Sequence, residues 1–261
     1  MLLAIDIGNS TLGLGLFPKP ERAVPAAVRK IPTRPIRSSA GYKEIISGFL
    51  PRNAVQAPGG VDAVISSVVP AANKAIIGAL RDLFGKKPLM VSHRLETGLA
   101  FGVRRPEKVG PDRIANAAAG CRSAGGPVAI VDFGTATTIT VVGEKNMFLG
   151  GAIMPGLQLM AKALSAGTAS LPAVHIKACA DALGKDTASA IRSGIVNGAA
   201  KAVEGLLKDM EKGLGFKLKL ILTGGHAGLM SPLFKRKHKV VPELTFQGMR
   251  LIYLKAQIRN R

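Results

Sequence analysis

An internal repeat constrains the fold of this chain more than any other feature of its sequence. Residues 4–11 read A-I-D-I-G-N-S-T and residues 130–137 read I-V-D-F-G-T-A-T, so that Asp6 and Asp132 lie 126 positions apart. Each copy is typical of an apolar strand that ends in an acid, followed by a glycine turn and a second strand. Self-similarity at this separation indicates two related domains rather than a solenoid.

The D-x-G turn has a chemistry that suits phosphate. Glycine lets the backbone approach a ligand closely, and the amides and hydroxyls that follow it can donate to phosphate oxygens. An aspartate at the end of a strand can hold Mg²⁺, which prefers a few carboxylates together with water and substrate phosphates. The alternative is an ordinary hairpin with Asp and Gly as turn residues. Two copies at one spacing favour the ligand site.

Two further segments add polar groups. A predicted strand at 218–222 ends in Thr223 and Gly224, a loop that either borders a nucleotide or only turns the chain into a helix. The segment 109–113 reads V-G-P-D-R and precedes a predicted helix with proline at its first position. Asp112 there is either a first-turn acid favoured by the helix dipole or a proton acceptor for a substrate hydroxyl.

The charge of the chain is strongly positive, with 36 Lys and Arg against 16 Asp and Glu, a net charge of +20. Six basic residues lie within 19–37 and eight within 235–261. Such clusters allow binding to nucleic acid, a solvated surface, or steering of nucleotides. Only two Tyr, nine Phe and no Trp are present to stack bases, so we expect no nucleic-acid partner.

Composition and hydropathy indicate a cytoplasmic globular α/β protein. The uncharged stretch 146–161 contains Gly and Pro and is shorter than the roughly 20 residues of a membrane span. Cys121 and Cys179 form no C-x-x-C pair, and we expect two buried thiols. Strands are predicted at 61–69 and 128–131. Helices are predicted over 71–84, from 158 to 164 after a Gly-rich approach, and from about 187. The basic, proline-containing segment 18–35 is predicted to be an extended surface excursion.

The order of the motifs resembles a known family. D-x-G turns in two domains are similar to those of the superfamily of actin, sugar kinases and heat-shock chaperones. Eight motifs in order resemble the type III pantothenate kinases over essentially the whole chain: D-I-G-N-S-T from 6, P-E-K-V-G-P-D-R from 106, D-F-G-T-A-T-T from 132, G-G-A-I-M-P-G from 150, T-A-S-L-P from 168, L-G-K-D-T from 183, T-G-G from 223 and L-T-F-Q-G-M-R-L-I-Y from 244.

The resemblance implies a fold and an activity. The expected fold is two ribonuclease-H-like, actin-like ATPase domains, over 1–115 and 116–261, with a nucleotide cleft between them. The expected activity is ATP-dependent phosphorylation of pantothenate to 4'-phosphopantothenate, the first step of coenzyme A biosynthesis. ATP, Mg²⁺ and a monovalent cation, K⁺ or NH₄⁺, are the expected cofactors, and a homodimer is the expected assembly.

The resemblance also assigns site residues. Asp6 is expected to hold Mg²⁺, Asp132 to hold K⁺, and Asp112 to act as the base. The residues expected to bind ATP are Asp6, Ile7, Gly8, Asn9, Ser10, Thr11, Gly134, Thr135, Thr137, Thr223 and Gly224. Those expected to bind pantothenate are Val103, Gly110, Pro111, Asp112, Arg113 and Thr168. Five positions depart from the usual pattern of the family, namely Ser10, Val103, Thr140, Gly167 and His175.

Two alternative functions remain open from the sequence. One is a catalytically weakened relative with a regulatory or binding role, of the Bvg accessory factor type. The other is a nuclease of ribonuclease-H fold, using Asp6 and Asp132 for two metal ions. A nuclease needs further clustered acids near those strands, whereas the second repeat offers Thr and Gly.

Overall fold

The computed structural model describes residues 1–52, 54, 60–178 and 181–259, and it divides the chain into two compact units. The first unit comprises Met1–Leu99, Val103–Arg122 and Glu243–Arg261; the second comprises Ala100–Gly102 and Ser123–Pro242. This division differs from the two contiguous segments expected from the sequence. The expected boundary at residue 115 falls inside a helix, and the C-terminal helix belongs to the first unit because it packs on the first sheet.

The first unit is built on a five-stranded sheet in the order β3-β2-β1-β4-β5. Strands β1, β2 and β3 are antiparallel, whereas β4 and β5 run parallel to β1. Its elements are β1 (Leu2–Ile7), β2 (Thr11–Phe17), β3 (Ala27–Pro32), α1 (Ser39–Ser47), β4 (Asp62–Ser67), α2 (Pro70–Phe84), β5 (Leu89–Met90), η1 (Pro106–Lys108), α3 (Pro111–Ala124) and α7 (Leu244–Arg259).

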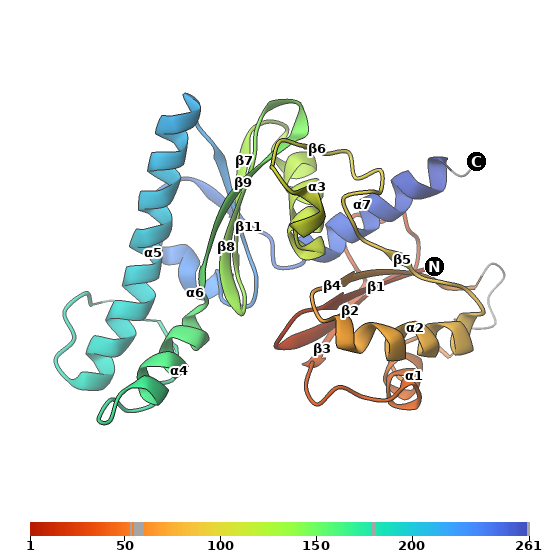
Figure 1. Ribbon diagram of the computed structural model, residues 1–261, viewed down its shortest axis with the longest axis horizontal. Helices are drawn as coiled ribbons and strands as arrows, with labels where there is room; N and C mark the ends of the chain where they lie inside the picture. Colours follow the sequence, from red (N-terminus) through yellow and green to blue (C-terminus); the bar gives the residue numbers. More distant parts are fainter. Residues whose placement is uncertain (53, 55–59, 179–180, 260–261) are drawn as a thin grey trace. The chain divides into compact units, whose positions relative to one another are not determined.

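Alternation along β1 determines what covers each face of this sheet. Leu3, Ile5 and Ile7 belong to a buried cluster with α1 and α2. The intervening residues, including Asp6, face the side covered by α7. Figure 1 shows α1 and α2 on one side of the sheet and α7 on the other. The acid of the first motif therefore lies on the α7 face.

The second unit repeats this topology in a six-stranded sheet, ordered β11-β10-β7-β8-β9-β6. Strands β7 to β11 have the places of β1 to β5, with β7–β8–β9 antiparallel and β10 and β11 parallel to β7. Its elements are β6 (Ala100–Phe101), β7 (Val128–Phe133), β8 (Ala136–Val142), η2 (Glu144–Asn146), β9 (Met147–Pro155), α4 (Leu157–Gly167), α5 (Thr187–Leu214), β10 (Lys219–Thr223), α6 (Ala227–Met230), η3 (Ser231–Leu233) and β11 (His238–Val240).

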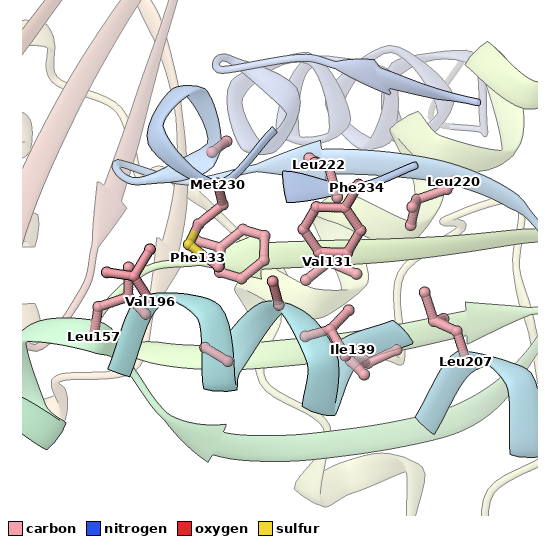
Figure 2. Packing of buried hydrophobic residues seen from close by; sticks show 14 of the residues in the cluster. Val131, Phe133, Ile139, Leu157, Val196, Leu207, Leu220, Leu222, Met230 and Phe234 are labelled. Atoms are coloured by element: carbon pink, nitrogen blue, oxygen red, sulfur yellow. The ribbon is translucent and has the colours of Figure 1, made fainter. Parts of the chain in front are cut away.

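The core of the second unit lies between its sheet and α5. Val131 and Phe133 of β7 pack with Val196 of α5, and Met230 and Phe234 close the cluster (Figure 2). The long helix begins at a capping box in which Asp186 and Ser189 satisfy each other's backbone amides. The predicted repeat is thus confirmed as two copies of one sheet topology.

Several local predictions are corrected by the structure. The segment 18–35 contains the edge strand β3, whose exposed side chains hide the alternation that marks a half-buried strand. Residues 150–155, expected as a Gly-rich approach to a helix, continue strand β9. Cys121 is half-buried in α3, and Cys179 lies outside the described residues. Within the described part of the chain, no helix has the length and apolar character needed to cross a membrane.

Candidate active site

The first D-x-G motif forms a tight turn between β1 and β2. The Gly8 amide donates to the Thr11 carbonyl at 3.0 Å, and Asn9, Ser10 and Thr11 are exposed beyond the sheet. Ile7 is fully buried, so its side chain belongs to the core and only its backbone can serve a ligand. The turn therefore presents amides and hydroxyls to solvent at the carboxyl end of β1.

Thr33, which no sequence motif marks, holds this turn through two hydrogen bonds. Its hydroxyl donates to the Gly8 carbonyl at 2.7 Å and its amide donates to the Ser10 carbonyl at 3.1 Å. The Thr33 side chain is fully buried. In the sequence, Thr33 is only a threonine that follows an exposed strand. Its two hydrogen-bond partners lie more than twenty residues earlier, so no local pattern indicates them.

The second D-x-G turn is one residue shorter than the first. The Gly134 amide donates to the Ala136 carbonyl at 3.1 Å, and Phe133 pairs with Thr137 where Ile7 pairs with Leu12 in the first unit. Residues of the two motifs therefore correspond at a constant offset before the turn, but the offset is one residue smaller after it. Thr137 consequently shares the core face with Phe133. It is 1% exposed, and its hydroxyl has no hydrogen-bond partner among the described residues.

Two threonines flank Asp132 on its own face of the sheet. Thr138 of β8 and Thr223 of β10 are the register partners of Asp132 on its two sides. Directly paired residues of neighbouring strands project on the same face. A hydroxyl therefore flanks the carboxylate on both sides. The motif spacing does not predict the place of Thr138, because the partner of Asp6 in β2 is Gly13 and the same offset leads to Ile139.

Two glycines pack against the second turn because no side chain fits there. A Cβ on Gly156, at the start of α4, would clash with the carbonyls of Gly134 and Thr135, and the Gly156 amide donates to the Thr135 carbonyl. Gly224 has φ +90°, and a Cβ there would clash with the Asp132 carboxylate. Gly156 thus packs on the backbone of the second turn, and Gly224 packs on the Asp132 carboxylate itself.

Asp112 lies in the first turn of α3, at the same edge of the first sheet as the first turn. A Cβ on Gly110 would lie 3.9 Å from Val68, whose amide donates to the Ile7 carbonyl at the end of β1. The Asp112 carboxylate accepts from the Arg113 amide at 2.8 Å. Burial raises the pKa of the Asp112 carboxyl, against the opposing effect of the hydrogen bond and charge of Arg113. A raised proton affinity suits a proton acceptor.

Helix α7 fixes α3 relative to the first hairpin. A Cβ on Gly13, the β2 partner of Asp6, would lie 2.8 Å from the Phe246 ring. Gly248 packs directly on the backbone of Ala115 in α3. The Thr245 hydroxyl donates to the Asn116 side-chain oxygen at 2.9 Å. One helical turn of α7 thus contacts both elements that carry predicted site residues of the first unit.

The remaining predicted residues are distributed over both units. Val103, Pro111 and Arg113 are half-buried in the first unit. Thr168 is exposed at the end of α4 in the second unit, where its hydroxyl donates to the Leu164 carbonyl at 2.7 Å. Thr140, at a departing position, is 1% exposed on the Asp132 face of β8. The structure thus places Asp112 near the first turn in the first unit, and Gly156 and Gly224 against the second turn in the second unit.

The side chains at each strand end suit Mg²⁺, which takes part of its coordination from phosphate and water, better than a metal that is bound by protein side chains alone. Each unit offers one strand-end carboxylate beside hydroxyls, and Mg²⁺ commonly takes one or two carboxylates together with phosphate and water. Among the described residues, no group of three His, Cys, Asp or Glu side chains gathers to hold a metal.

The repeated sheets and their strand-end acids define the actin-like ATPase and sugar-kinase class of α/β fold. The fold is shared by a Baf family protein from Campylobacter jejuni (TM-score 0.63, 20% identity, 99% of this chain and 100% of the other). It is also shared by the activator of 2-hydroxyisocaproyl-CoA dehydratase from Clostridium difficile, solved with ADPNP bound (TM-score 0.54, 14% identity, 96% of that chain).

Sequence comparison identifies the family. Residues 2–209 match the family model of type III pantothenate kinase. A type III pantothenate kinase of Dictyoglomus turgidum is 41% identical over 98% of this chain and 99% of its own length. Another, of Agathobacter rectalis, is 35% identical over 98% and 97%. The chain belongs to the type III pantothenate kinase family.

Proposed function

We propose that this protein transfers the γ-phosphoryl group of ATP to pantothenate, giving 4'-phosphopantothenate and ADP, the first step of coenzyme A biosynthesis in the cytoplasm. The observation that carries the proposal is the 41% identity to a type III pantothenate kinase over nearly the full length of both chains. The repeated D-x-G turns and the placement of Asp112 support it.

In the proposed reaction, the primary hydroxyl oxygen of pantothenate attacks the γ-phosphorus of ATP. The bond to the β–γ bridging oxygen breaks, ADP leaves with that electron pair, and the hydroxyl proton passes to the Asp112 carboxylate. Phosphoryl transfer depends mostly on positioning and on neutralising phosphate charge. Asp112 therefore needs to be held in place as well as to accept the proton. The contacts of α7 with α3 hold the helix that carries it.

The phosphates of ATP would be bound by the two turns. In the first, Asn9, Ser10 and Thr11 would supply amides and hydroxyls, and Gly8, whose own amide closes the turn, would let the backbone approach the phosphates. In the second, Thr135 would supply the corresponding groups beside Gly134, and Thr223 and Gly224 would border the nucleotide. The role of Thr137 in binding stays a prediction, as does the position of the nucleotide between the domains.

Asp6 would hold Mg²⁺, and Asp132 with its flanking Thr138 and Thr223 hydroxyls would hold the monovalent cation, K⁺ or NH₄⁺. Mg²⁺, when bound, neutralises phosphate charge during transfer. Oxygen donors such as these suit hard cations.

Pantothenate would contact Gly110, Pro111 and Arg113 beside the base, and Val103 of the same unit. The contact of Thr168 with pantothenate, in the site of its own chain or in that of the partner, stays a prediction. Arg113 is suited to the pantothenate carboxylate, because a guanidinium can bind a carboxylate through two hydrogen bonds. Val103 offers an apolar side chain where relatives commonly have an aromatic one.

A homodimer is supported by an apolar groove of about 600 Å³ on the second unit, between α4 and α5. The exposed Leu159 and Ile153 add apolar surface to the same unit. Exposed apolar patches of this kind mark interaction sites. Ala190→Glu in the groove should yield a monomer in sedimentation, whereas Ala202→Glu, exposed on the same helix outside the groove lining, should not. An unchanged dimer in Ala190→Glu would place the interface elsewhere.

ADP release coupled to pantothenate addition tests the proposed activity, with K⁺ or Na⁺ present. We expect turnover to require pantothenate and Asp112→Ala to lose most of it while still binding ATP. Asp82→Ala, an exposed acid on α2 of the same unit, is the matched control and should behave as the wild type. ATP binding without pantothenate-dependent turnover in the wild type would instead favour the regulatory alternative.

A further inference from the structure

The two acids at the strand ends have matching neighbours in the parallel strand beside them. In the second unit, Asp132 pairs with Thr223 of β10. In the first unit, Asp6 pairs with Ser66 of β4. Because β4 and β10 have the same place in the repeated topology, Ser66 is the counterpart of Thr223. The fold thus sets a hydroxyl beside each acid, on the same face and one strand away, about 4.8 Å across the sheet.

Ser66 differs from the hydroxyls around it because it is buried and unused. Its side chain is fully buried, and its Oγ has no hydrogen-bond partner among the described residues. The next residue, Ser67, has a structural role, since its hydroxyl donates to Asn73 at 2.6 Å and accepts from the Val69 amide at 3.2 Å. A buried polar group without a partner is costly and calls for an explanation.

The register partner of Asp6 on its other side has no side chain. The β2 partner of Asp6 is Gly13, and the Phe246 ring fills the space that a side chain would take there. In the second unit the same place is occupied by Thr138. Of the two register partners of Asp6, Ser66 alone carries a hydroxyl. A hydroxyl can rotate to donate to a neighbouring carboxylate.

We propose that Ser66 is a positioning residue for Asp6: its hydroxyl donates to one carboxylate oxygen when Asp6 takes up the cation that accompanies ATP, and so leaves the other oxygen for the cation. The inference rests on the proposed function only for the assignment of the cation to Asp6. A carboxylate that is already oriented by a hydrogen bond loses less conformational entropy when the cation binds. Hydrogen-bond partners of metal-binding side chains generally have this effect.

Three variants test the proposal. Ser66→Ala removes the hydroxyl, and Ser66→Thr restores it with the residue that stands at the equivalent place in the second unit. Ser39→Ala is the matched control, because Ser39 Oγ in α1 of the same unit is also buried without a partner. The readout is the affinity for Mn²⁺ measured by electron paramagnetic resonance in the presence of AMP-PNP, which needs no turnover. Thermal unfolding is measured alongside.

We expect Ser66→Ala to weaken Mn²⁺ binding about tenfold, the scale of one hydrogen bond to a charged group. Ser66→Thr should recover most of that affinity, and Ser39→Ala should leave it unchanged. An unchanged Mn²⁺ affinity in Ser66→Ala, an equal loss in Ser39→Ala, or no Mn²⁺ binding by the wild type would overturn the positioning role. If the pattern holds but the wild type does not phosphorylate pantothenate, the proposed function fails while the role of Ser66 stands.

Discussion

Replacing Thr33 with valine tests whether the first D-x-G turn depends on the hydrogen bond from the Thr33 hydroxyl. Valine keeps the shape of threonine and the amide that donates to Ser10, but it removes the hydroxyl that donates to the Gly8 carbonyl at 2.7 Å. The Gly8 carbonyl then loses its partner at a partly buried site. We expect a loss of about 1 kcal/mol, the lower end of the range for an unpaired buried group.

That loss has two measurable consequences. In a chain of this size, about 1 kcal/mol corresponds to a fall of roughly 2–4 °C in the unfolding temperature. If the turn must be reordered when phosphate binds, the same free energy raises the KM for ATP roughly fivefold. The KM for pantothenate should stay close to the wild-type value, because Asp112 and Arg113 are untouched.

Thr97→Val is the matched control for this experiment. Thr97 is also buried in the first unit, and its hydroxyl accepts from the Leu99 amide at 3.2 Å. We expect it to lower the unfolding temperature by a similar amount without changing the KM for ATP. The reasoning is refuted if Thr33→Val lowers stability but leaves the KM for ATP at the value of the control.

Three further substitutions have defined outcomes. Asp112→Asn should abolish turnover yet stabilise the protein at pH 7, because a carboxylate whose pKa is raised by burial is least costly when protonated; this gain should shrink as the pH falls through the folded-state pKa. Glu211→Gln should cost about 2 kcal/mol near neutral pH in chemical denaturation, because Glu211 accepts from the Leu218 amide and from Arg236. The pKa of Glu211 is lowered, so this difference should fade as the pH falls below about 4. Gly156→Ala should reduce both activity and stability, since its Cβ would meet the Thr135 carbonyl, whereas Gly167→Ala on the same helix, in open space, should change stability little.

The repeat allowed the sequence to predict two domains, the turns and the strand-end acids, because each depends on residues close together in the chain. The constant spacing matches Thr137 with Thr11, which is exposed, whereas Thr137 is buried, since a one-residue difference in turn length reverses the side on which the following residues project. Thr138 lies beside Asp132 for the same reason, because the constant spacing from Gly13, the partner of Asp6, leads to Ile139 instead.

Features that depend on distant contacts could not be predicted in the same way. The partition of α7 into the first unit depends on Phe246 fitting over Gly13 and Gly15, more than 200 residues earlier in the chain. The edge strand β3 has exposed cationic side chains and thus lacks the period-two pattern of a half-buried strand. Thr33 and Ser66 have no motif of their own, and only the strand register shows what they adjoin.

Because α7 at the end of the chain packs on the first sheet, it affects the order in which the two units fold during synthesis. Residues 123–242 of the second unit form one continuous insertion between α3 and α7. The ribosome therefore synthesises residues 123–242 before Phe246, whose ring covers Gly13 and Gly15. Because domains generally fold as units during synthesis, we expect the second unit to be complete while the first, although begun earlier, still lacks its cover. Asp6 and Asp112, encoded in the first half of the chain, would thus be the last part of the catalytic machinery to be assembled.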